Sequence, residues 1–235
     1  MFRLIRPALA VAFFASFVVG NATAADEPSA SLKKGDRIVF LGDSITAAGV
    51  GPKGYVTLIK NALAEKHKDL GVEVIGAGVS GNKVPDVQGR LEKDVLSKKP
   101  TIVVIYIGIN DVWHGEKDPA KGTSKENYEA GLRDVIKRCR DAGARVVLCT
   151  PSVIGEKNDG SNTNDVKLDE YAGISRAVAK DLKVPICDLR KAFQAYEKDH
   201  NPDNKEAGIL TGDHVHLNDA GNQFVADAIL KTLGA

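Results

Sequence analysis

Three side chains in this sequence can together form an activated nucleophile. Asp213 and His216 lie three residues apart, so one tight turn can point the carboxylate at the imidazole. Ser44 follows the apolar run Arg37–Leu41 and supplies a hydroxyl at the end of a predicted strand. A serine becomes nucleophilic when a base lies within hydrogen-bond reach and a third group orients that base. The pattern predicts acyl-transfer chemistry with Ser44 as nucleophile, His216 as base and Asp213 orienting the base.

Acyl transfer also needs hydrogen-bond donors for the oxygen that becomes negative. Gly78 follows the apolar run Val72–Ala77, and a glycine there lets a backbone amide approach a ligand without a Cβ in the way. Asn110 follows the run Thr101–Ile107 and can present its side-chain amide. If these strands flank the first one, Gly78 and Asn110 converge with Ser44 at one edge of the sheet.

Alternating apolar and helical stretches must position these residues. The apolar runs, rich in Val and Ile, are Arg37–Leu41, Val72–Ala77, Thr101–Ile107, Arg145–Cys149 and Val184–Leu189. The predicted helices are Tyr55–Lys66, Val84–Lys98, Ser124–Ala142, Val166–Leu182 and Asp219–Leu233. Apolar residues at successive positions are typical of strands covered on both faces, which indicates a parallel sheet. The alternation predicts the α/β class, as a three-layer α/β/α domain with a doubly wound five-stranded parallel sheet.

The order of these motifs resembles that of the SGNH, or GDSL-type, hydrolases. Four blocks occur in order, namely Gly42-Asp43-Ser44-Ile45, the block around Gly78, Gly108-Ile109-Asn110-Asp111, and Asp213-His214-Val215-His216. The resemblance implies a flavodoxin-like fold and a metal-independent serine esterase. It also implies an oxyanion hole made of the Ser44 amide, the Gly78 amide and Asn110 Nδ2, with His216 as base and Asp213 as its partner.

Two residues depart from the family pattern. Ile45 replaces the Leu of the family's name, which is a mild apolar change. Gly76 stands where many members have Asn. The second change puts in doubt a supporting hydrogen bond near the Gly78 loop, but not the amide donor itself.

The sequence defines the substrate less closely than the catalytic groups. Two polar stretches, Gly115–Ser124 and Gly155–Asp165, follow strand ends, where open α/β sheets bind ligands. We expect substrate contacts there and from Trp113, His114 and Asp43, although Trp113 can also fill the core. A polar rim with one aromatic plate favours short acyl groups, such as acetyl, on a carbohydrate or similar hydroxylated small molecule or oligosaccharide.

Two other functions stay open beside a short-chain esterase. One is a lysophospholipase, lipase or thioesterase of the same family, which would prefer longer acyl chains. The other is a secreted carbohydrate-binding domain that has kept the fold without turnover, since fold alone does not establish activity.

Two further kinds of site match parts of the sequence. Residues 76–81 have the glycine spacing of a dinucleotide site, but on the second strand and without an acidic residue on the next strand to hold a ribose. His214 and His216 alternate as metal ligands can, and Asp43 or Asp111 could complete a set. A catalytic zinc takes three protein ligands, and the remaining histidines lack a matching spacing. We therefore expect neither a cofactor nor a metal.

The first 25 residues have the features of an export signal. Arg3 and Arg6 precede the apolar run Ala8–Gly20, and the small residues 22–25 follow it. The run is shorter than the roughly 20 apolar residues that span a bilayer. We expect cleavage, a secreted or periplasmic protein without a stable membrane anchor, and one domain over residues 26–235.

Charge and cysteine content bound the partners and the redox chemistry. The chain has 32 basic and 31 acidic residues, so removing the two arginines of the signal leaves a charge near −1. This balance argues against a nucleic-acid partner, which would require a basic patch. Cys139, Cys149 and Cys187 lack CxxC spacing and lie in apolar stretches, as buried thiols do. In an oxidising compartment one disulfide, for instance between Cys149 and Cys187, is an alternative to free thiols.

Overall fold

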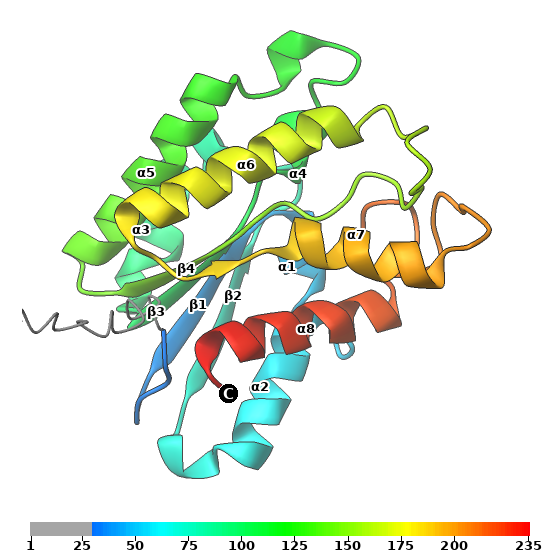
Figure 1. Cartoon of the computed structure of the whole chain (residues 1–235). Helices are drawn as coiled ribbons and strands as arrows, with labels where there is room; N and C mark the ends of the chain where they lie inside the picture. The colour runs from blue at the N-terminus through cyan, green and yellow to red at the C-terminus, as the bar shows by residue number, and fades with distance from the viewer. Residues whose placement is uncertain (1–29) are drawn as a thin grey trace, which may run out of the picture.

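The computed structural model describes residues 30–235, so the predicted signal peptide, residues 1–25, lies outside the described residues. A five-stranded parallel sheet has the strand order β2-β1-β3-β4-β5. The strands are β1 (Arg37–Gly42), β2 (Glu73–Gly78), β3 (Ile102–Tyr106), β4 (Arg145–Cys149) and β5 (Ile186–Cys187). Helices cover both faces of the sheet (Figure 1), which confirms the predicted doubly wound three-layer fold.

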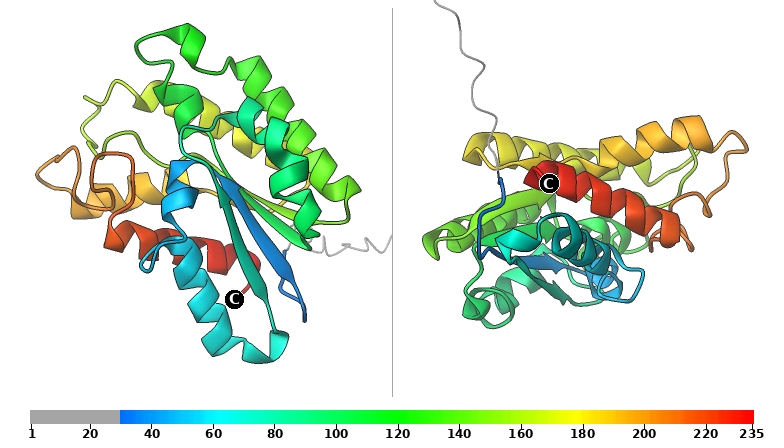
Figure 2. Two further views of the ribbon diagram at one scale, coloured as in Figure 1. Left: turned by 180° about the vertical axis from the view of Figure 1, so that it is seen from behind. Right: turned by 90° about the horizontal axis from the view of Figure 1, so that it is seen from below.

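The helices divide between the two faces of the sheet. The α-helices are α1 (Ser44–Ala48), α2 (Tyr55–Lys66), α3 (Val84–Asp94), α4 (Ile109–Trp113), α5 (Lys125–Asp141), α6 (Asp165–Leu182), α7 (Leu189–His200) and α8 (Asp219–Leu233). Three short 3₁₀ helices are η1 (Lys68–Leu70), η2 (Leu96–Lys98) and η3 (Pro119–Lys121). Helices α3, α5 and α6 pack side by side on one face, and α2 packs against α8 on the other (Figure 2).

The central strands β1, β3 and β4 are apolar on both sides of the sheet. All five residues of β3 are buried, as expected for a central strand covered by helices on both faces. Gly42 at the end of β1 pairs with Gly78 of β2 and with Tyr106 of β3. The ends of these three strands are therefore level, and the loops that follow them share one edge. The chain winds outward in both directions from β1 and β3, and such a switch point is where doubly wound sheets bind ligands.

The structure corrects two of the predicted elements and adds one helix. The predicted strand Val184–Leu189 contains only a two-residue β5, because the Asp188 carboxylate accepts a hydrogen bond from Lys191 N and begins α7. The sequence patterns do not predict α7, whose first residue, Leu189, falls at the end of the predicted strand. The predicted helix Val84–Lys98 ends at Asp94 and continues as η2.

The three cysteines are buried free thiols in this structure. Cys149 and Cys187 are direct neighbours across β4 and β5 but are not joined by a disulfide. Between residues 30 and 235, no helix is both long and apolar enough to cross a membrane.

Candidate active site

Ser44, His216 and Asp213 form a continuous chain of hydrogen bonds. His216 Nε2 lies 2.9 Å from Ser44 Oγ, although the two residues are 172 positions apart in the sequence. His216 Nδ1 lies 2.8 Å from Asp213 Oδ2. Both ring nitrogens of His216 are therefore engaged, one with the hydroxyl and one with the carboxylate. In this arrangement the imidazole can take the hydroxyl proton while the carboxylate fixes the orientation of the ring.

The turn that carries Asp213 and His216 is held by its own backbone. Asp213 Oδ1 accepts hydrogen bonds from His216 N at 2.7 Å and Val215 N at 3.2 Å. Burial alone would raise the pKa of Asp213, but these bonds and the one from the His216 ring outweigh it and lower the pKa. The carboxylate therefore stays ionised opposite the imidazole, as a base-orienting group must.

Glu156, which no sequence pattern predicts as a site residue, anchors the segment before that turn. Its carboxylate is fully buried and accepts hydrogen bonds from the amides of Ile209, Leu210 and Thr211 at 2.9, 2.6 and 2.7 Å. Gly155 N also donates to His214 O at 2.7 Å. The polar stretch after β4 thus supports the turn that presents His216.

Ser44 is the first residue of α1, directly after β1. Asp43 caps this helix by accepting a hydrogen bond from Ile45 N at 2.9 Å. Its side chain is buried, and this burial raises the pKa of Asp43 to about 7 despite the bond from Ile45. A buried capping carboxylate favours a structural role over the substrate contact expected from the sequence.

The predicted oxyanion donors surround the same point of the sheet. Gly78 ends β2 and lies against the backbone of α1, where a Cβ would lie 2.7 Å from Asp43 O and 2.5 Å from the Thr46 carbonyl carbon. The Asn110 side chain is buried and donates through Nδ2 to Asn82 O at 3.0 Å. Because a primary amide carries two N–H groups, this bond orients Asn110 and leaves a second donor.

Two residues near these donors have roles that the motif itself did not reveal. Asp111, beside Asn110, accepts hydrogen bonds from Val84 N at 3.0 and 3.3 Å and so begins α3. Burial raises the pKa of Asp111 to about 6. Gly76, which departs from the family pattern, packs so closely on Val50 that a Cβ there would overlap its methyl group.

Residues 40–224 match the family model of the GDSL-like lipase/acylhydrolases. The chain belongs to the GDSL-like lipase/acylhydrolase family. It is a carboxylic ester hydrolase with the SGNH fold, as the order of the sequence motifs predicts.

Known members of this GDSL-like family resemble the chain over most of its length. An acetylxylan esterase from Geobacillus stearothermophilus is 32% identical over 215 residues, which is 85% of this chain and 94% of that protein. The crystal structure of an acetyl xylan esterase, AlAXEase, matches with a TM-score of 0.81 and 46% identity, covering 84% of this chain and 99% of that one.

Crystal structures of an acetylxylan esterase from Geobacillus stearothermophilus include catalytic mutants in which a serine, an aspartate or a histidine is replaced by alanine. The serine mutant matches with a TM-score of 0.76 and 28% identity, covering 87% of this chain and 96% of that one. The aspartate and histidine replaced in that enzyme are three positions apart. Asp213 and His216 have the same spacing.

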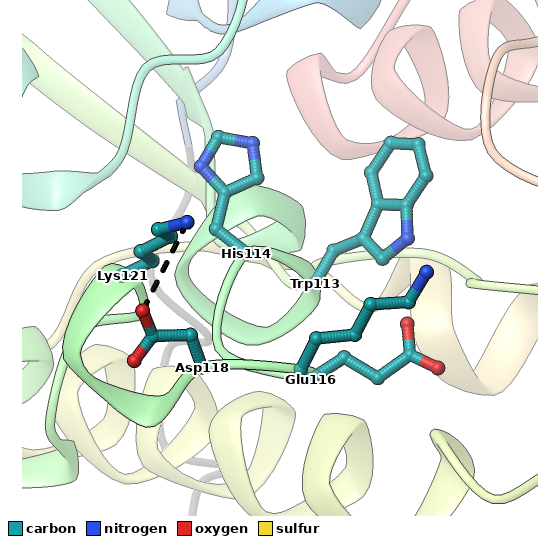
Figure 3. Close-up of a pocket in the computed structure, with 6 residues that line it drawn as sticks. Trp113, His114, Glu116, Asp118 and Lys121 are labelled. Atoms are coloured by element: carbon teal, nitrogen blue, oxygen red, sulfur yellow. Dashed lines mark ion pairs between the residues drawn. The ribbon is translucent and has the colours of Figure 1, made fainter.

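A cavity opens beside the end of α4, just after Asn110. It measures about 340 Å³ and is lined by Trp113, His114, Glu116, Lys117, Asp118 and Lys121. The Trp113 and His114 rings project from the same side of the helix end, beside an ion pair between Asp118 and Lys121 (Figure 3). Trp113 also packs partly on the core and meets the His214 ring edge-on at 6.0 Å between centroids. This contact joins the cavity to the turn that carries Asp213 and His216.

The two polar stretches expected to contact substrate differ in their surroundings. The first, Gly115–Ser124, supplies four of the residues that line the cavity beside Trp113. In the second, Asn158 Nδ2 donates to Glu197 O at 2.7 Å and Asn162 Nδ2 donates to Ile154 O at 2.8 Å. The Asn158 amide therefore ties this stretch to α7, and the Asn162 amide ties it to the segment that follows β4.

The two histidines considered as metal ligands, His214 and His216, make different contacts. His216 is engaged by Ser44 and Asp213, whereas His214 has a left-handed backbone with φ of 70° and packs on Trp113. Among residues 30–235, no group of three or more His, Cys, Asp or Glu side chains is arranged to hold a metal ion.

Proposed function

We propose that this chain is a serine esterase that removes acetyl groups from a carbohydrate, with Ser44, His216 and Asp213 as its catalytic triad. The observation that carries the proposal is the hydrogen-bond chain from Ser44 Oγ through the His216 ring to Asp213. The catalytic serine, histidine and aspartate of the related acetylxylan esterase support the same assignment.

The proposed reaction proceeds in two steps. His216 Nε2 takes the Ser44 proton while Oγ attacks the ester carbonyl carbon, and the alcohol leaves with a proton returned by His216. Water, deprotonated by His216, then attacks the carbonyl carbon of the acyl-serine. The bond to Ser44 Oγ breaks as His216 returns the proton to Oγ, which releases acetate and restores the hydroxyl. In each step the Ser44 amide, the Gly78 amide and the free N–H of Asn110 Nδ2 stabilise the negative oxygen.

The preference for an acetyl group on a hydroxylated carrier rests on the surroundings of the site. The cavity beside Trp113 is lined by four charged side chains, which can form hydrogen bonds with the hydroxyl groups of a sugar. Trp113 and His114 supply flat surfaces for a sugar ring. The related acetylxylan esterases agree with this choice.

Hydrolysis of p-nitrophenyl acetate by wild type and Ser44→Ala tests the enzymatic assignment. We expect the Ser44→Ala variant to lose all but background activity. Ser97→Ala serves as the matched control, because that hydroxyl lies in η2 and donates to Lys93 O. Equal rates for wild type and Ser44→Ala would remove the hydrolase proposal and favour the non-catalytic carbohydrate-binding domain.

A chain-length series of p-nitrophenyl esters, followed by acetate release from acetylated xylan, tests the substrate. The proposal expects kcat/KM to fall from acetate to octanoate and acetate to be released from the polysaccharide. A rise in kcat/KM with chain length would instead assign a lipase, lysophospholipase or thioesterase.

We also propose that residues 1–25 direct export and are removed, leaving residues 26–235 as one hydrolase domain. The support is the order of Arg3, Arg6 and the apolar run Ala8–Gly20 in the sequence. N-terminal sequencing of the protein from the culture medium or periplasm tests it. Recovery of a full-length chain in the cytoplasm alone would contradict it.

A further inference from the structure

Arg90 connects the segments that carry the oxyanion donors. It projects from α3, and its side chain is 14% exposed. Its Nη2 donates to Gly42 O at 2.7 Å, its Nη1 to Ala77 O at 2.9 Å, and its Nε to Asn82 Oδ1 at 2.6 Å. The guanidinium thus bonds the end of β1, the end of β2 and the loop after β2 at once.

Each of these three bonds leads to a proposed donor. Gly42 precedes the Asp43–Ser44 segment, and Ala77 precedes Gly78. Asn82, whose side chain Arg90 holds, accepts the Asn110 Nδ2 hydrogen bond on its backbone oxygen. The Arg90 guanidinium therefore bonds a residue that is next to, or hydrogen-bonded to, each segment that carries a proposed donor.

The bond to Ala77 O has a direct geometric effect on Gly78. The Ala77–Gly78 peptide is trans, since the described residues contain no cis peptide bond. In a planar trans peptide the carbonyl oxygen and the following N–H point in opposite directions. Holding the Ala77 oxygen with a charged donor therefore fixes the direction of the Gly78 N–H. The same bond also polarises the peptide and strengthens this N–H as a donor.

A lysine could not replace Arg90 in this position. The guanidinium is planar and offers five N–H donors in a rigid fork, whereas an ammonium is a single point of charge. The contacted oxygens belong to three separate segments, and Arg90 also reaches Asp94 Oδ2 at 3.3 Å within α3. Only a side chain with several N–H donors in fixed directions, such as the guanidinium, can hold all of these oxygens at the same time.

We propose that Arg90 is a positioning residue of the esterase, which sets the direction of the Gly78 and Asn110 donors without touching substrate. This inference rests on the proposed function, because it assigns those donors to an oxyanion hole. It predicts that Arg90 acts on the transition state rather than on substrate binding, because the donors it orients bond most strongly to the oxyanion.

The test compares wild type, Arg90→Lys and Arg138→Lys on p-nitrophenyl acetate. Arg138 is a matched control because it also bonds a carbonyl of α3, Gln88 O at 3.0 Å, without contacting the donor segments. For Arg90→Lys we expect kcat to fall about 10- to 100-fold, the cost of misplacing catalytic groups by up to ~1 Å, with KM nearly unchanged. Arg138→Lys should keep the wild-type kcat.

A second readout separates orientation of the donors from general damage. Ethylboronic acid forms an anionic tetrahedral adduct on a catalytic serine and places a boron-bound oxygen where the oxyanion would lie. Its inhibition constant should rise for Arg90→Lys by a factor similar to the loss in kcat/KM, because both report transition-state binding. A merely structural role would lower the amount of folded enzyme and leave the inhibition constant of the remainder unchanged.

The outcomes distinguish this proposal from the proposed function. If wild type hydrolyses the ester and Ser44→Ala does not, the function stands whatever Arg90→Lys does. A folded Arg90→Lys variant with wild-type kcat and boronate inhibition would then overturn the role of Arg90. If Arg90→Lys fails to fold, Asn82→Ala decides, since it removes the Oδ1 acceptor and leaves Arg90 in place. A fall in its kcat with unchanged KM supports the proposal, and a wild-type kcat overturns the role of Arg90 in orienting Asn110.

Discussion

A single methyl group added at Gly78 should slow catalysis by pushing α1 away from β2. A Cβ at this position lies 2.5 Å from the Thr46 carbonyl carbon and 2.7 Å from Asp43 O, and it also overlaps Ala47 N. All three atoms belong to the backbone, so rotation of a side chain cannot relieve the overlap. Ordinary contacts are 3.4 Å or longer, and α1 must therefore separate from the end of β2 by about 1 Å.

The expected loss in kcat follows from the residues that α1 and β2 carry. Ser44 is the first residue of α1, and Gly78 is the last residue of β2. Their separation changes the distance between the nucleophile and a proposed oxyanion donor. A misplacement of ~1 Å costs on the order of a hundredfold in rate, so we expect kcat of Gly78→Ala on p-nitrophenyl acetate to fall by about that factor. Overpacking should also cost about 1–3 kcal/mol in the free energy of unfolding, measured by urea denaturation.

Gly173→Ala provides the control for this substitution. Gly173 lies within α6, and a Cβ there has no other atom within 4 Å. Alanine should stabilise that helix by about 0.5–1 kcal/mol and leave kcat unchanged. A folded Gly78→Ala variant with wild-type kcat would show that the close packing of Gly78 on α1 has no bearing on catalysis.

Three further predictions concern the donors, the supporting carboxylate and the buried cap. Asn110→Ala should lower kcat on the order of 10²- to 10³-fold in ester assays, the usual cost of one oxyanion donor. Glu156→Gln should lose about 2–3 kcal/mol of unfolding free energy in urea, since an amide cannot accept from all three N–H groups that the carboxylate binds. Because the pKa of Asp43 is raised to about 7, its ionisation opposes folding, and its contribution to stability falls as pH rises from about 4 to 7. Asp43→Asn should therefore gain thermal stability over wild type at pH 8 but not at pH 3.5, and an equal difference at both would contradict the burial argument.

The sheet was predictable because its central strands are continuous apolar runs of five or six residues, a pattern typical of buried parallel strands. The missed helix α7 had a weaker signal, although Leu189, Phe193 and Tyr196 recur at helical spacing and pack inward. The apolar run before it made Leu189 resemble the end of a strand. Helices α1 and α4 span five residues each, about one turn, which is too short for a periodic pattern to be visible.

The catalytic candidates were predictable because their chemistry is local, while their supports were not. Asp213 and His216 are three positions apart, so a turn brings them together. Glu156 acts 53 to 55 positions away, and Arg90 bonds Gly42 at a separation of 48. Glu156 binds three backbone amides, and Arg90 binds two backbone oxygens besides the side chains of Asn82 and Asp94. Every residue has these backbone groups, so the sequence does not show which of them a side chain will bind. A lone Glu or Arg in a polar stretch carries no such information until the fold places it.

Two separate networks hold the two halves of the proposed site. On the sheet side, Arg90 binds the ends of β1 and β2, and Asp111 begins α3. On the loop side, Glu156 binds the segment that leads to Asp213 and His216. The Ser44–His216 hydrogen bond joins the halves. Because each half is fixed by charged groups bonded to backbone, the hydroxyl and the imidazole are held in place before substrate arrives. If Ser44 and His216 are catalytic, as we propose, we expect this preorganisation to contribute to the rate, because the hydrogen bond joins residues that are 172 positions apart.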